Sequence, residues 1–259
     1  MSGYPRAVLS EERMAWLPPK IKSSDLVLCH TGDVGKRQDA RQRTEAQIVE
    51  LGRRQLVTYG AAGLSLRAIA RDLGMVSSAV YRYVSSRDEL LTLLLVDAYT
   101  ELADAVDRTR DAHQGGSWRD DLLAMAHAMR RWAVDHPARW ALLYGSPVPG
   151  YHAPAQRTTG PGTRVMGALL ATVHDGVVAG DVRTSDPAGQ HPSPDFDVIR
   201  HGFGFPGDDT VLAKCSLVWA SIIGAISLEV FEGYGADTFS RPAALFNTQV
   251  ELLVGVLTS

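Results

Sequence analysis

The sequence predicts an all-α protein, and three observations support this fold class. Apolar residues recur at the three- and four-residue steps of amphipathic helices along most of the chain. No alternation of polar and apolar residues, the pattern of half-buried strands, continues beyond a few residues. Clusters of proline and glycine separate the helical stretches and predict loops. A chain of 259 residues is long enough for a small domain and a larger one.

The chain is predicted to divide into a leader and two domains. Residues 1–37 contain scattered prolines and glycines without a sustained period, so we expect a poorly ordered leader. The alternative is a biological start further downstream, for example at Met14. Residues 38–88 are predicted to form the small domain, which begins with a helix over 38–59. A long helix then leads into the larger domain, residues 89–259.

Residues 65–84 predict two short helices joined by a tight turn. Apolar residues of the first helix follow the spacing of one helical face. Ser65 precedes this helix, where a side-chain oxygen caps free backbone N–H groups. Gly74 follows it, at the position where a left-handed residue is usually needed. Ser77 is placed to cap the second helix.

The second helix of this pair is predicted to turn Val80 and Val84 inward. The side chains predicted to stay largely outside are Ser78, Ala79, Tyr81, Arg82 and Tyr83. This is the pattern of a helix-turn-helix, whose second helix enters the major groove of DNA.

A family resemblance is carried by the run LRAIARDLGMVSSAVYRYVSSRDELL. It resembles the DNA-binding signature of the TetR family of one-component transcriptional regulators, and the match covers residues 41–95. Two residues depart from the family pattern: Val84 stands where the family usually has phenylalanine, and Arg87 where it usually has lysine. The resemblance implies a homodimeric, helical regulator whose larger domain binds a small molecule.

The chemistry of DNA recognition indicates two sets of contact residues. Base reading requires short groups and arginine on the recognition helix, which predicts Ser77, Ser78, Ala79 and Arg82. Backbone contacts require donors around this helix, which predicts Thr44, Ser65, Tyr81, Tyr83 and Arg87.

Charge is distributed unevenly along the chain. Residues 36–90 contain ten basic and six acidic residues, a net charge of +4. Residues 91–259 contain twelve basic and nineteen acidic residues, a net charge of −7, and residues 1–35 are neutral. A basic segment beside an acidic one is expected when one part of a protein meets phosphate. The alternative is ordinary drift of charge along a chain.

The larger domain is predicted to be helical between two long loops. A helix follows Arg87 as far as residues 113–116, and Ser117 with Asp120 predicts a capping box for the next helix. A short helix is expected over 138–144. The proline- and glycine-rich residues 145–162 and 180–209 are predicted to be loops. Helices are expected over 163–178, 210–234 and 242–257.

The last two predicted helices are unusually apolar, which indicates burial on several sides. One interpretation is a core helix of a monomer. The interpretation that the resemblance favours is a dimer interface built as a four-helix bundle. The predicted interface residues are Val218, Ile222, Ile226, Val230, Phe246, Val250 and Leu253.

An effector pocket is predicted in the larger domain, because apolar side chains with a few polar tips are typical of small-molecule cavities. The candidate residues are Met125, His127, Met129, Trp132, Trp140, Tyr144, Tyr151, His152, Met166 and Trp219. Plain core packing is the alternative for each of them. Residues 136–145 resemble a ligand-domain motif of one branch of the TetR family, the WHG type.

Other kinds of site are poorly supported. Residues 202–207 match GxGxxG but have no preceding strand, and the eight histidines lack metal-ligand spacing. We therefore predict no cofactor, no metal and no catalytic residue. Two distant cysteines, no signal-peptide core and no stretch near the roughly 20 apolar residues of a membrane span indicate a cytoplasmic protein without a membrane partner.

The sequence thus predicts a dimeric regulator, most simply a repressor that a small-molecule effector releases from a palindromic DNA operator. The alternatives are a helix-turn-helix module that binds DNA or protein without an effector, and an α-helical enzyme.

Overall fold

The computed structural model describes residues 32–112, 115–183, 194–235 and 237–259, and these residues form helices without any strand. The all-α fold class is therefore confirmed. The helices, with one 3₁₀ turn (η2), are α1 Gly32–Tyr59, η2 Ala61–Gly63, α2 Leu66–Asp72, α3 Ser77–Val80, α4 Arg87–Ala112, α5 Trp118–Asp135, α6 Pro137–Tyr144, α7 Ala155–Val178, α8 Pro194–Phe203, α9 Asp209–Val230 and α10 Pro242–Thr258.

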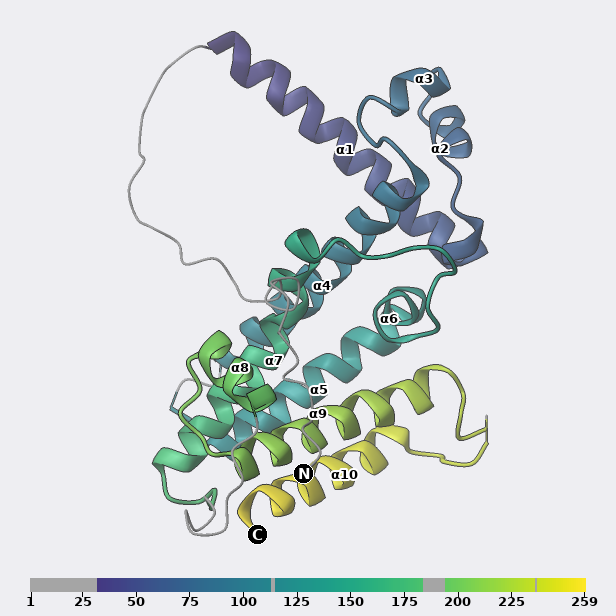
Figure 1. Cartoon of the computed structure of the whole chain (residues 1–259). Helices are drawn as coiled ribbons and strands as arrows, with labels where there is room; N and C mark the ends of the chain where they lie inside the picture. The colour runs from purple at the N-terminus through teal and green to yellow at the C-terminus, as the bar shows by residue number, and fades with distance from the viewer. Residues whose placement is uncertain (1–31, 113–114, 184–193, 236) are drawn as a thin grey trace, which may run out of the picture.

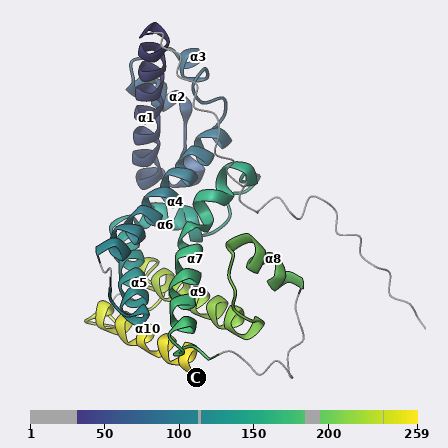
Figure 2. The same ribbon diagram turned by 90° about the vertical axis from the view of Figure 1, so that its left-hand side faces the viewer.

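The molecule is elongated, with a small helical domain at one end. Helices α1, α2 and α3 form this end, and α4 runs from it into the bundle of the remaining helices (Figure 1). Helices α9 and α10 lie side by side at the opposite end. A view turned by 90° shows the same order along the molecule, with α8 to one side of the bundle (Figure 2).

Two hydrophobic cores hold the protein together, and α4 belongs to both. Its N-terminal residues Leu90 and Leu94 pack with the buried side chains of α1, α2 and α3. Its later residues Leu102 and Val106 pack in the core of the larger domain. The predicted domain boundary after residue 88 thus falls at the start of a helix that both domains share.

The end of α6 and the loop after it also connect the two domains. Leu142, Val148 and Tyr151 pack against the core of the small domain, although they follow the long helix by many residues. The Tyr151 hydroxyl lies 2.9 Å from Oγ1 of Thr92, a buried residue of α4. The small domain therefore rests on side chains of the larger one.

Most predicted boundaries agree with the structure within a few residues. The first helix ends at Tyr59, as predicted, but α1 begins at Gly32, within the predicted leader. Residues 1–31 of the leader, including Met14, lie outside the described residues. The predicted capping box is present: Ser117 Oγ accepts from the Asp120 backbone N–H at 3.2 Å, and the Ser117 N–H donates to the Asp120 carboxylate at 3.3 Å.

Three predictions for the larger domain are wrong. Helix α7 begins at Ala155 and includes Pro161, although residues up to 162 were predicted to be a loop. Helix α8 lies within the second predicted loop. Helix α9 ends at Val230 instead of 234, and Glu232 beyond it has a left-handed φ of 57°.

Tertiary contacts explain why α7 forms around a proline. Arg157 pairs with Glu89 of α4 at 2.7 Å, before the proline. Arg164 pairs with Asp104 and Asp107 of α4 at 2.8 and 2.6 Å, after it. These pairs and the burial of Val165 and Leu169 in the larger core hold α7 along α4, which offsets the helical hydrogen bond that a proline removes.

Candidate nucleic-acid interface

The first helix of the helix-turn-helix, α2, is fixed at both ends as predicted. Ser65 Oγ accepts from the Ala68 N–H at 3.3 Å and caps α2. The Ser65 N–H donates to Gln55 of α1 at 2.8 Å, and the Gln55 amide donates back to the Ser65 carbonyl at 3.3 Å. Gly74 has a φ of +64° and turns the chain toward α3. The start of α2 is therefore held on α1.

Helix α3 is short, and its start differs from the prediction. Val76 is the N-cap and makes no side-chain cap, so Ser77 is the first residue of the helix and does not cap it. Val80 and Val84 are fully buried, as predicted. Ala79 is 9% exposed and faces the core, so its predicted outward position is wrong.

The outer surface of α3 and the turn after it carries small polar groups, a phenol and a guanidinium. Ser77, Ser78 and Arg82 are exposed, and Tyr81 is 45% exposed. Because these donors and acceptors are exposed to solvent, this surface is chemically suited to hydrogen-bond base edges and phosphates.

Four other predicted contact residues have roles inside the protein. Ser65 caps α2, and the Thr44 hydroxyl donates to the Ala40 carbonyl at 3.0 Å. Tyr83 is half-buried, with the Arg41 guanidinium 5.7 Å from its ring centre. Arg87 is half-buried, and its Nη2 donates to the Ala61 carbonyl at 2.9 Å. Arg87 thus ties the start of α4 to η2.

Two exposed arginines were missed by the sequence analysis. Arg43 lies on α1 and Arg67 on α2, and neither makes an ion pair within the part of the chain that the structure describes. Their cationic side chains are available to phosphate. The predicted contacts were taken mainly from the motif around α3. The excess of basic residues over 36–90 is the sequence feature that could have indicated these two arginines.

The predicted pocket residues do not form one site. Met125, Met129, Trp132 and Trp140 are core residues with at most 5% exposure. His127 lies 3.0 Å from the Asn247 side chain of α10. Three further members lie elsewhere: His152 is exposed, Met166 is half-buried on α7, and Tyr151 packs on the small domain.

Three of the predicted pocket residues do lie together, with a fourth that was missed. Tyr144 has its ring centre 4.4 Å from that of Trp140 and 6.4 Å from that of Trp219. Tyr99 of α4 adds an edge contact to Tyr144 at 6.5 Å. Burial raises the pKa of the Tyr144 phenol, with a smaller effect from Tyr99. This aromatic cluster joins α4, α6 and α9.

The predicted dimer contacts are mostly inside the protein. Five of them are at most 2% exposed in the larger core, namely Val218, Ile222, Ile226, Phe246 and Val250. Their side chains are thus largely covered within one chain, although Ile222, Phe246 and Val250 also line the groove between α9 and α10. Val230 and Leu253 are half-buried.

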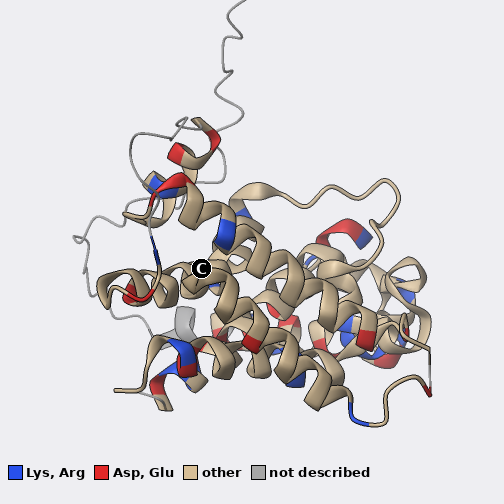
Figure 3. Cartoon of the chain, turned by 90° about the horizontal axis from the view of Figure 1, so that it is seen from below, with Lys and Arg blue, Asp and Glu red and all other residues tan. Residues whose placement is uncertain are grey.

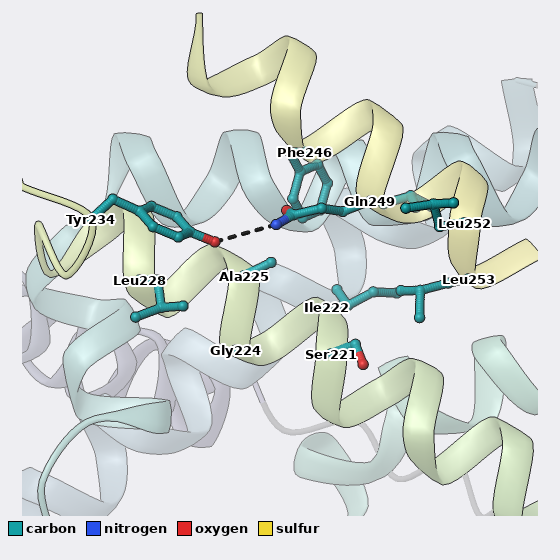
Figure 4. A pocket seen from close by; sticks show the side chains of 11 residues that line it. Ser221, Ile222, Gly224, Ala225, Leu228, Tyr234, Phe246, Gln249, Leu252 and Leu253 are labelled. Carbon is teal, nitrogen blue, oxygen red and sulfur yellow. Dashed lines mark hydrogen bonds between the residues drawn. The ribbon is translucent and has the colours of Figure 1, made fainter. Parts of the chain in front are cut away.

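The outer faces of α9 and α10 form an apolar groove. Its volume is about 430 Å³. Figure 4 shows the groove from close by, with Leu228 and Gly224 on α9, Leu252 on α10, and the Tyr234 hydroxyl accepting from Gln249 at 3.3 Å. Seen from below, few charged residues lie along these helices (Figure 3). Leu217, Leu228 and Leu252 are 51%, 45% and 67% exposed.

Helix α9 also corrects the expectation about membrane spans. Asp209–Val230 is long and apolar enough to cross a bilayer by length and composition, with a mean hydropathy of 1.9. A single such helix is weak evidence, because core helices of soluble proteins pass the same test. Here one side of α9 packs in the core and the other forms the groove with α10.

The protein has a helix-turn-helix with an exposed polar recognition surface. This motif lies on a basic domain that is joined to a helical bundle, and the combination defines a DNA-binding regulator. Residues 48–94 match the profile of bacterial regulatory proteins of the tetR family, and residues 122–253 match that of the tetracyclin repressor-like C-terminal domain. The chain is 65% identical over 231 residues to the HTH-type transcriptional regulator Rv1816 of Mycobacterium tuberculosis (strain ATCC 25618 / H37Rv), covering 89% of this chain and 99% of that one. The chain belongs to the TetR family of transcriptional regulators.

Solved structures agree with this assignment. The crystal structure of SCO4313, described as a regulatory protein, matches with a TM-score of 0.68 and 33% identity over 85% of this chain and 98% of that one. The FadR regulator of Bacillus subtilis, solved with stearoyl-CoA, matches with a TM-score of 0.57 over 82% of this chain and 98% of that one. Its identity of 14% shows a shared fold alone.

Proposed function

We propose that this regulator is a homodimeric repressor that a small-molecule effector releases from a palindromic operator. The observation that carries the proposal is the exposed surface of α3 and of the turn after it, where Ser77, Ser78, Tyr81 and Arg82 lie exposed around the buried Val80. In a dimer, two such helices enter major grooves one or more helical turns apart. The protein then acts by binding, without catalysis, in the cytoplasm where its DNA lies.

The side chains of this surface are assigned different tasks. Arg82 is suited to a bidentate contact with guanine, and Ser77 and Ser78 to hydrogen bonds with base edges. Tyr81, Arg43 and Arg67 are assigned to phosphates, because they are exposed donors on the α1, α2 and α3 segments of one small domain. The four residues with internal contacts hold this surface in place.

The dimer is assigned to the outer faces of α9 and α10. These faces carry the exposed leucines of the groove together with small residues such as Gly224 and Gly255, where a Cβ atom meets nothing within 4 Å. Small residues let the backbones of two helices approach closely, and the leucines supply apolar area that association removes from water. The interface thus uses the predicted helices, with the predicted residues Ile222, Phe246, Val250 and Leu253 among those that line the groove.

The effector is assigned to the aromatic cluster of Tyr99, Trp140, Tyr144 and Trp219. It joins α4, which carries the small domain, to α6 and α9. A ligand that binds one arrangement of these helices better than another shifts the spacing of the two recognition helices. These rings pack against one another, so a ligand enters by parting them, and aromatic side chains with phenol hydroxyls favour an apolar ligand with few polar groups.

Selection of DNA from a random pool by the purified protein tests the proposal. We expect enrichment of a palindrome with two half-sites whose affinity falls as salt rises. Enriched DNA whose binding no compound changes would favour an effector-independent module. Weak, salt-sensitive binding without any enriched sequence would overturn operator recognition.

A thermal-shift screen of apolar compounds tests the effector site. A true effector should raise the melting temperature of the wild-type protein and release it from the selected operator. Both effects should be lost in Trp219→Ala, while Val178→Ala, an exposed site on α7, should retain them. Equal responses of the two variants would place the effector elsewhere.

A further inference from the structure

Val76, the residue before α3, is an exposed aliphatic side chain on an otherwise polar surface. It is 71% exposed, and the exposed Ser77 and Ser78 follow it directly. Residues 65–84 are all described by the structure, and their other aliphatic side chains are buried or half-buried. Even Ala79, which the sequence placed on the outer surface, is buried. Val76 is thus the aliphatic group that the helix-turn-helix presents to solvent.

The position of Val76 usually carries a different kind of residue. Val76 is the N-cap of α3, where serine, threonine, aspartate and asparagine are preferred because their side-chain oxygens accept from free backbone N–H groups. Valine has no such oxygen, and no side chain caps α3. The chain therefore forgoes a stabilising hydrogen bond at this position and exposes an apolar side chain to water instead.

The packing of the turn does not account for this valine. An apolar residue just before the N-cap often packs against the fourth residue of the helix and fixes the entry of the chain. Met75 holds that place, because it packs against the core that contains Val80, the fourth residue of α3. At 71% exposure, Val76 adds little to this core.

The backbone on both sides of Val76 is held by hydrogen bonds. The Met75 N–H donates to the Ala70 carbonyl at 2.9 Å, which is the longer bond of a Schellman motif at the end of α2. The Val76 carbonyl accepts from the Ala79 N–H at 2.9 Å. Valine also has few side-chain rotamers, because it is branched at Cβ. Its exposed methyl groups therefore have a defined place beside the start of α3.

This place determines what Val76 meets on DNA. The N-terminal residues of a recognition helix contact base edges in the major groove. The base pairs present hydrogen-bond donors and acceptors there, and the apolar group among them is the C5-methyl of thymine. Contact between this methyl and an aliphatic side chain removes both from water, which favours binding.

We propose that Val76 is a specificity-determining residue that recognises a thymine through its C5-methyl group. Each half-site then carries a thymine at the start of α3, with its methyl packed against the isopropyl group of Val76. Ser77 and Ser78 recognise their bases by hydrogen bonds, so Val76 adds an apolar contact to a polar set. The inference rests on the operator binding of the proposed function.

Uracil in place of thymine tests this contact, because it removes the C5-methyl and keeps every hydrogen-bonding group of the base. In the operator selected from the random pool, each thymine of the half-site and its symmetry mate are replaced in turn. We expect one position in each half-site at which uracil weakens binding of the wild-type protein. The loss should be about fourfold for each methyl, the size expected for burial of one such group.

Val76→Ser is the decisive variant, because serine removes the methyl groups and supplies a capping oxygen. It should lose the sensitivity to uracil and relax the preference for that thymine in a new selection. Its melting temperature should equal or exceed that of the wild type, which separates base recognition from folding. Val76→Ala shortens the side chain without adding a hydroxyl group, and it should reduce the sensitivity as well.

Val57→Ser is the matched control. Val57 is 73% exposed, and it lies in the last turn of α1, away from α3 (Figure 1). This variant should keep the uracil sensitivity of the wild type.

Two results would overturn the inference alone. One is a selected operator in which uracil weakens wild-type binding at no thymine, and the other is equal uracil sensitivity in the wild type and both Val76 variants. A wild-type protein that selects no DNA would overturn the proposed function, and the inference with it.

Discussion

Arg82 and Arg87 are close in sequence but have different surroundings. Arg82 is exposed beyond α3, whereas Arg87 is half-buried and donates to the Ala61 carbonyl at 2.9 Å. The motif suggested DNA contact for both of them. The sequence does not distinguish the exposed arginine from the one with an internal hydrogen bond, because the acceptor of Arg87 lies far from it in sequence. The three-dimensional structure does.

We therefore expect opposite effects of replacing these two arginines. Arg82→Ala should leave the melting temperature unchanged, cost about 1–3 kcal/mol in operator binding and relax base preference at one position. Arg87→Ala should lower the free energy of unfolding by about 1 kcal/mol through loss of its hydrogen bond. Denaturant unfolding and binding to operator variants measure both. Loss of stability in Arg82→Ala would contradict the assignment.

Cys215 is the other residue whose chemistry follows from its surroundings. Burial raises the pKa of its thiol to about 12. Since the thiolate is the reactive form, very little of it is present at pH 8. In a Cys29→Ser variant, a thiol reagent at pH 8 should therefore modify the native protein slowly and the unfolded protein rapidly. Rapid native modification would show that the core around α9 opens readily.

At the scale of elements, helix ends were predicted best where a local signal fixes them. The Ser117 capping box, the Ser65 cap and the left-handed Gly74 each depend on neighbouring residues alone, and all are present. The start of α7, residues 155–162, and the whole of α8 were missed over proline- and glycine-rich stretches, because their stabilising contacts come from distant elements. The Arg157–Glu89 pair is one of these contacts.

Gly74 offers a test of the turn between α2 and α3. Its φ of +64° is costly for residues with a Cβ atom, and asparagine tolerates it better than alanine. We expect Gly74→Ala to destabilise the protein by about 1 kcal/mol, and Gly74→Asn by less. Denaturant unfolding of the two variants measures the difference. Equal stability of Gly74→Ala and wild type would show that the turn adapts.

The site was predicted less completely than the fold, because the periodicity of a helix does not show which of its neighbours each face contacts. Periodicity shows that a helix has an apolar face, but a helix apolar on two sides does not reveal which side is inside. The stripe with Val218 and Ile222 was therefore predicted as an interface, whereas both side chains are buried within one chain and Ile222 also lines the groove. The aromatic cluster was found in part for the same reason, since Tyr99 lies on a helix whose other apolar residues fill two cores.

At the scale of the whole molecule, α4 carries the small domain at one end and packs in the larger core at the other. The proposed dimer surface, on α9 and α10, lies at the end of the molecule opposite the recognition helix (Figure 1). The two DNA-binding surfaces of a dimer are therefore positioned through the full length of both chains. Under the proposed function, this geometry carries small shifts in the bundle to the operator without any contact between effector and DNA.

Breaking the proposed interface should consequently weaken DNA binding from a distance. Leu252 is 67% exposed on α10, and Leu252→Glu would place a charge in the apolar groove, where burial without a partner is costly. Val178 is 74% exposed at the end of α7, so Val178→Glu is a matched control. Sedimentation should show a monomer for Leu252→Glu and a dimer for Val178→Glu.

Operator binding follows from the same pair of variants. In a dimer, binding of one recognition helix holds the second helix close to the other half-site, which raises the affinity for the palindrome. This gain is lost when the chains separate, so the affinity of Leu252→Glu for the palindrome should fall by about 100-fold or more. Affinity for an isolated half-site should stay equal to that of the wild type, because α3 is untouched. A Leu252→Glu protein that remains dimeric would move the interface away from α9 and α10. A monomer with undiminished operator affinity would instead show that one recognition helix suffices.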